Sequence, residues 1–211
     1  MDRRTFLRLS AGAVAALAMP AGLSGCASEG ARAAEAVKAL LTSYVVPAEE
    51  GAEDAPESTW PAADYGDAET MERLETYGVD PDEWHRHCLA HFSFEVGEGT
   101  VDEETGEASV AANLTNACLA SALEGAGQDY AAYSETQEAE DAYAAGGKAA
   151  LFGQLVSYVY ARLDADESPV TTTVQVRCAK GDDGSWAPRV ADDEAFFSAL
   201  YGGTSVAVPT L

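Results

Sequence analysis

Two stretches of alternating apolar and polar residues, each interrupted by a turn sequence, restrict this chain to folds that contain antiparallel β-structure. The first stretch covers residues 92–114 and turns at 104–106. The second begins at 170, turns at an Asp-Asp-Gly sequence, and returns as a partner strand over 186–190. Period-two alternation is typical of strands with one buried face, and Asp-Gly steps favour tight hairpins. We therefore expect two hairpins.

Helical periodicity accounts for most of the remaining chain. Apolar residues spaced three and four apart predict helices over 29–45, 67–76 and 81–92, a long alanine-rich helical region over 119–164, and a short helix after 192–194. Gly146-Gly147 is expected to break the long region in two. The combination predicts an α+β fold, with a curved antiparallel sheet of two hairpins packed on several helices.

The first 25 residues have the organisation of an export signal, with a basic start, an alanine-rich apolar segment and a small-residue end. The apolar segment is shorter than the roughly 20 residues of a membrane-spanning helix. Arg3-Arg4 resembles the twin-arginine export motif, although the general secretion route stays open. Leu23-Ser24-Gly25-Cys26 resembles a lipobox. The resemblance implies that the Cys26 thiol carries diacylglycerol, with palmitate-type acyl chains, after cleavage before Cys26.

This interpretation sets the domain organisation and the location. We expect a lipoprotein signal peptide over 1–25, an N-terminal helix and acidic Pro-rich linker over 26–66, and a single α+β domain over 67–211. Two or more acyl chains anchor a protein stably to a bilayer. The expected location is the extracytoplasmic face of the cell membrane, where the domain is held at the cell surface by its lipid.

The strong negative charge limits the classes of partner. The chain carries a formal charge of −24, and removal of a signal with three arginines and one aspartate makes it −26. Nucleic acid is excluded as a partner, because its recognition needs Lys and Arg to neutralise phosphates. The acidic run 102–107 lacks the ligand spacing of a calcium loop and is interpreted as a turn.

Residues 92–116 and 170–203 resemble strand pairs of small lipoproteins of the nuclear-transport-factor-2-like or cystatin-like superfamily. The shared pattern is a strand, a Lys-x-Asp-Gly type of turn, a Trp that opens the next strand, and a short helix with an acidic start. The resemblance implies a curved sheet wrapped around helices. The superfamily includes uncharacterised members, enzymes and ligand-binding domains, and no catalytic residue of those enzymes maps onto this chain.

All three histidines lie in the segment 85–91, which also contains a cysteine. On a helix, His91 lies four residues after His87 and three after Cys88, a spacing that can place two or three of these ligands on one zinc ion. A complete site needs a fourth ligand from another element. Clustered histidines near a helix C-terminus also occur for purely structural reasons. No other cofactor is expected.

The sequence thus favours a non-enzymatic binding or accessory domain whose protein or small-molecule partner is unknown. Two alternatives stay open, and both depend on geometry. One is an enzyme that uses the cavity of the fold, for which no catalytic residue is assigned. The other is a metal-binding lipoprotein that uses the His85 to His91 segment.

Overall fold

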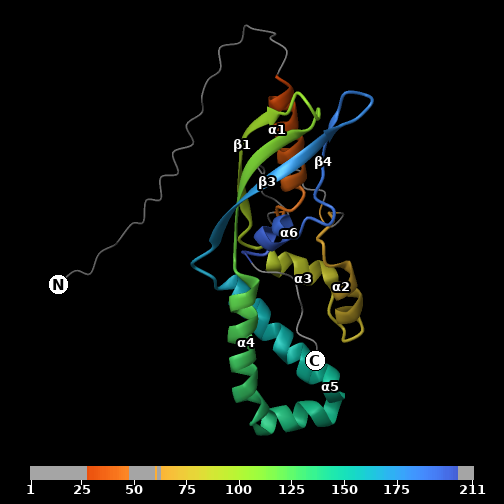
Figure 1. Cartoon of the computed structure of the whole chain (residues 1–211). Coiled ribbons are helices and arrows are strands. Elements are labelled where there is room, and N and C mark those ends of the chain that lie inside the picture. Colours follow the sequence, from red (N-terminus) through yellow and green to blue (C-terminus); the bar gives the residue numbers. More distant parts are fainter. Residues whose placement is uncertain (1–27, 48–59, 61–62, 204–211) are drawn as a thin grey trace, which may run out of the picture.

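The computed structural model describes residues 28–47, 60 and 63–203 of the chain (Figure 1). In chain order the elements are α1 (Glu29–Thr42), α2 (Ala68–Glu75), α3 (Pro81–Cys88), β1 (Ser93–Val101), β2 (Ala108–Asn116), α4 (Leu119–Ser134), α5 (Gln137–Asp164), β3 (Val170–Lys180), β4 (Trp186–Pro188) and α6 (Glu194–Leu200). The four strands form an antiparallel sheet packed on helices, so the expected α+β class is confirmed.

The sheet has the strand order β1-β2-β3-β4, and both expected hairpins are part of it. The central strands β2 and β3 pair over nine residues, from Ala108 opposite Cys178 to Asn116 opposite Val170. The helices α4 and α5 are inserted between these two paired strands. Strand β4 is shorter than expected and ends at Pro188, although the Arg189 N–H still donates to the Arg177 carbonyl of β3 at 2.8 Å.

One face of the sheet is buried and the other faces solvent. Buried and half-buried residues alternate along the whole of β2. In β3, the buried residues Val174 and Val176 lie opposite Ala112 and Val110 of β2. The opposite face carries hydroxyl and amide side chains, including the pair Thr115 and Thr171, whose oxygens are 2.7 Å apart. Alternation therefore identified which side of each strand meets the core.

Helix α1 fills the concave side of the sheet. Its residues Ala33, Val37 and Leu41, together with Tyr44 just beyond it, are fully buried. The helix contacts β1 and β4, which are the two edge strands, as well as β2. The expected division placed this helix in a segment preceding the domain, whereas it belongs to the same core as the residues after 66. The acidic segment 48–59 lies outside the described residues.

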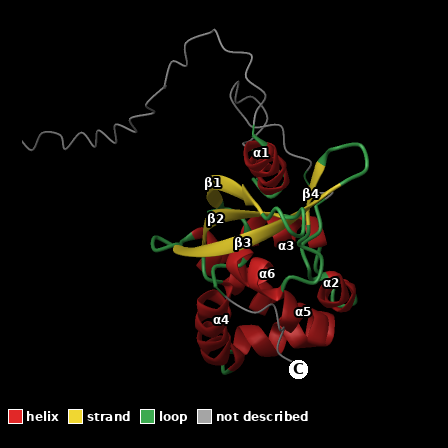
Figure 2. Ribbon diagram, turned by 45° about the horizontal axis from the view of Figure 1, so that its top comes forward, coloured by secondary structure: helices red, strands yellow, loops and turns green. Residues whose placement is uncertain are grey.

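The long helical region forms a hairpin that extends away from the start of α1 (Figures 1 and 2). The expected break at Gly147 is present as a kink in α5, with φ 62° and ψ −148°. A second break, which the sequence did not indicate to us, lies at Glu135-Thr136. There the Thr136 hydroxyl caps α5 by accepting a hydrogen bond from the Ala139 N–H at 3.3 Å.

Candidate functional site

The three residues assigned to export and lipidation, Arg3, Arg4 and Cys26, lie outside the described residues. The described chain begins at Ser28, two residues after Cys26. The Ser28 hydroxyl caps α1 by accepting a hydrogen bond from the Ala31 N–H at 3.2 Å. Helix α1 therefore starts almost immediately after the expected lipid-bearing residue.

The first turn of α1 is bound to both edges of the sheet. On one side, the Glu29 carboxylate accepts hydrogen bonds of 3.0 Å from the Trp186 indole N–H and from the Lys180 ammonium. The hydrogen bonds from Lys180 and then Trp186 hold the pKa of the Glu29 carboxyl below its ordinary 4.5. On the other side, Gly30 packs against the backbone of Gly99 in β1. The start of α1 is thus fixed to the folded body.

A β-bulge in β1 creates the space for this crossing. Between Val96 and Gly99, two residues of β1 lie opposite the single residue Ala111 of β2. The extra residue changes which positions of β1 face inward, so that Val96 and then Gly99 lie on the side of the strand that faces α1. Because Gly99 has no side chain, the two backbones can approach closely. An added Cβ on Gly30 would lie 1.9 Å from the Gly99 carbonyl oxygen.

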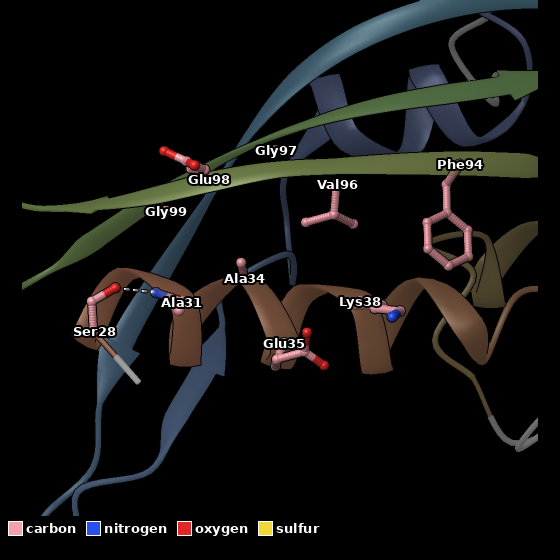
Figure 3. Close-up of a pocket in the computed structure, with 10 residues that line it drawn as sticks. All are labelled: Ser28, Ala31, Ala34, Glu35, Lys38, Phe94, Val96, Gly97, Glu98 and Gly99. Atoms are coloured by element: carbon pink, nitrogen blue, oxygen red, sulfur yellow. Dashed lines mark hydrogen bonds between the residues drawn. The ribbon is translucent and has the colours of Figure 1, made fainter. Parts of the chain in front are cut away.

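Beside this crossing, α1 and β1 form the walls of an open groove of about 700 Å³ (Figure 3). Val96 and Phe94 point from β1 toward α1, and Ala34 points from α1 toward β1, whereas Glu98 points away from α1. The complete lining consists of Ser28, Ala31, Ala34, Glu35, Lys38, Phe94, Val96, Gly97, Glu98 and Gly99. The groove combines an apolar floor with charged residues along its rim.

A buried polar cluster lies elsewhere, where α2, α3 and the end of α6 meet. The Asp67 carboxylate accepts hydrogen bonds from His85 Nε2 at 2.9 Å and from the Tyr201 hydroxyl at 2.8 Å. Asp67 and His85 are each about 5% exposed. The Tyr65 ring stacks on the His85 ring with centroids 3.7 Å apart. The Asp67 carboxylate, His85 Nε2 and the Tyr201 hydroxyl satisfy one another, which is typical of a structural network, whereas the buried Tyr65 hydroxyl has no hydrogen-bond partner among the described residues.

The acid–base properties of the neighbouring groups agree with a structural role. Burial, and then the nearby Asp67 carboxylate, raises the pKa of the Tyr201 hydroxyl well above its ordinary 10.0. Burial likewise raises the pKa of the Cys88 thiol well above its ordinary 9.0. A thiol nucleophile requires a lowered pKa and access to solvent, and Cys88 has neither. Cys88 and Cys178 are buried and form no disulfide with each other.

The three histidines do not converge on one centre, because His85 bonds Asp67 whereas His87 and His91 bond different atoms of Asp164. His85 belongs to the Asp67 cluster. His87 Nδ1 donates to the Asp164 carboxylate at 2.8 Å, and His91 Nε2 donates to the Asp164 carbonyl at 3.2 Å. Cys88 faces the core. Within the described part of the chain, no three His, Cys, Asp or Glu side chains are grouped so that they could hold a metal ion.

Sequence reasoning missed both the groove and the Asp67 cluster. The pair Gly97 and Gly99 in an alternating strand was a usable signal for the bulge. Asp67 and Tyr201 are 134 residues apart, and no local pattern joins them.

Comparison with protein-family models, with curated proteins and with solved structures finds no match to this chain. None of the helices in the described ranges is both long enough and apolar enough to cross a membrane.

Proposed function

We propose that this chain is a binding or accessory domain held at the extracytoplasmic face of the membrane by acyl chains on Cys26. The complete signal ending in Cys26 supports the anchor. The Ser28 cap of α1 supports a close attachment, because two extended residues span only about 7 Å. The lipid is then joined to the folded body with almost no tether.

One observation favours a binding function over an enzyme that uses a cavity inside the curved sheet. The concave side of the sheet is occupied by α1, whose Ala33, Val37 and Leu41 are fully buried there. An open groove lies outside this interior, between α1 and β1. A partner can enter this groove without displacing any part of the core. The curved sheet around α1 also supports, as a proposal, kinship with the nuclear-transport-factor-2-like or cystatin-like superfamily.

The attachment point gives the domain an orientation. The start of α1 and the tips of both hairpins lie at one end of the molecule, and the α4–α5 hairpin lies at the other (Figure 1). The hairpin tips carry acidic residues, including Asp102 and Asp183. Anionic headgroups repel these residues, so the lipid alone holds the domain at the membrane. Because the lipid is attached at the α1 end, the α4–α5 hairpin is directed away from the membrane.

Membrane retention of the full chain tests the proposal. We expect the wild-type protein in the membrane fraction after an alkaline carbonate wash, and Cys26→Ser in the soluble extracytoplasmic fraction or as unprocessed precursor. Cys118→Ser is the matched control, and it should fractionate as wild type. Equal retention of wild type and Cys26→Ser contradicts a lipid anchor on Cys26. Export that persists without the twin-arginine translocase identifies the general secretion route instead.

A further inference from the structure

We infer that the groove between α1 and β1 binds an extended peptide segment of a partner protein, which adds to the sheet as a fifth strand beside β1. The segment has apolar side chains at alternate positions and Lys or Arg between them. This inference rests on the proposed binding function and names the chemistry of its partner.

The edge of β1 provides the backbone groups for such an addition. Among the residues that the structure describes, β1 pairs only with β2. In an antiparallel ladder, half of the N–H and C=O groups of an edge strand point outward and are free to pair with an added strand. The bulge after Val96 interrupts the regular edge, so the available stretch is Ser93 to Val96. A short extended segment fits this stretch.

The groove explains the apolar half of the expected pattern. The sheet already curls around α1, and a fifth strand would continue that curl over the outer side of the helix. Its inward side chains would meet Phe94 and Val96 on β1 and the small residues Ala31 and Ala34 on α1 (Figure 3). Alanines on one wall leave room for larger apolar side chains on the added strand.

Charge accounts for the Lys or Arg positions of the expected segment. It also argues against a second copy of this chain as the partner. Side chains that alternate with the inward set would point to the solvent side, where Glu95 and Glu98 of β1 are exposed. Opposite charges on neighbouring strands stabilise the pair. Two copies joined through β1 would instead bring these glutamates together, and acidic side chains on an edge are a common protection against self-association.

The probe for this inference is an eight-residue peptide of alternating valine and lysine with blocked ends, and binding is followed by fluorescence anisotropy. The protein is the full chain purified from membranes and held in a lipid nanodisc. We expect saturable binding, and at least tenfold weaker binding of two control peptides. One has glutamate in place of lysine, and the other has N-methylated valines, which lack the N–H donors needed for strand pairing.

Two helix variants localise the binding. Ala34→Leu fills the groove from its α1 wall and should weaken binding at least tenfold. Ala39→Leu makes the same change at an exposed position of α1 outside the groove and should leave binding unchanged. Equal affinity of the two variants, or equal affinity of the lysine and glutamate peptides, overturns the inference.

The same assay on full-chain Cys26→Ser separates this inference from the proposed anchor. Peptide binding by Cys26→Ser with the affinity of wild type supports a groove that works without the lipid, and the anchor is then judged by membrane retention alone. A lipidated protein that does not bind the peptide supports the anchor and overturns the groove.

Discussion

Replacing Gly30 with alanine tests how α1 is seated on the sheet. The new Cβ would lie 1.9 Å from the Gly99 carbonyl oxygen. Ordinary carbon–oxygen contacts lie near 3.3 Å, so α1 and β1 must separate by about 1.4 Å or distort. Overpacking of this kind costs about 1–3 kcal/mol, and the better helix propensity of alanine offsets up to about 1 kcal/mol. We therefore expect a net loss of about 1–2 kcal/mol.

The matched control is Gly153→Ala. Gly153 lies inside α5, and an added Cβ there meets nothing within 4 Å. The same substitution should therefore stabilise the protein by up to about 1 kcal/mol, because only helix propensity changes. Opposite signs for one type of substitution separate the close crossing from a general effect of alanine.

Thermal unfolding followed by circular dichroism measures both changes. For a protein of this size, 1 kcal/mol shifts the midpoint by about 2–4 °C. Gly30→Ala should lower Tm by up to about 8 °C, and Gly153→Ala should raise it by up to about 4 °C. A Gly30→Ala protein as stable as wild type, or more stable, refutes the close approach of α1 and β1.

Three further predictions concern buried polar groups. Asp67→Asn should destabilise the protein by about 3 kcal/mol in urea unfolding, because it removes the carboxylate shared by His85 and Tyr201. A free energy of unfolding within about 0.5 kcal/mol of wild type, which is the usual effect of a surface substitution, contradicts this role. Asn116→Leu should cost about 2–3 kcal/mol, since its amide group bonds the carbonyls of Cys88 and Leu200 and the N–H of Ala117. An unchanged urea midpoint would show that those bonds contribute nothing. Stability should also fall as the pH rises above 10.0, because the folded state keeps the Tyr201 proton that the unfolded chain releases. The contribution is fully present below pH 10.0, and Tyr201→Phe should reduce the alkaline loss measured by urea unfolding at pH 8 and pH 11. An identical alkaline loss in the two proteins contradicts the raised pKa of Tyr201.

Local signals predicted the elements of the fold well. Alternation identified both buried strand faces, and the Asp80-Pro81 pair marked the start of α3, where the Asp80 carboxylate accepts from the Asp82 N–H at 2.8 Å. Gly147 marked the kink in α5. The break at Thr136 was missed because alanine-rich sequence continues on both sides of it, and a single capping threonine is a weak signal.

Long-range relationships were harder to predict. The sequence gives no indication that α1 fills the sheet, since its amphipathic pattern also suits a helix on the outside of a domain. The glycines of β1 do not reveal in the sequence that Gly99 lies against Gly30, because that contact exists only in the folded chain. The groove forms between these two segments, about 60 residues apart, and therefore appears only with the tertiary structure.

Mass spectrometry of the N-terminal tryptic peptide from the membrane fraction tests the central claim most directly. Trypsin cleaves after arginine, so the mature protein should release the peptide Cys26 to Arg32. The lipid anchor predicts that this peptide begins at Cys26 and carries the mass of a diacylglyceryl group, with or without a further acyl chain. An unmodified peptide that continues through Gly25 into Cys26 in the mature, membrane-associated protein would contradict the account.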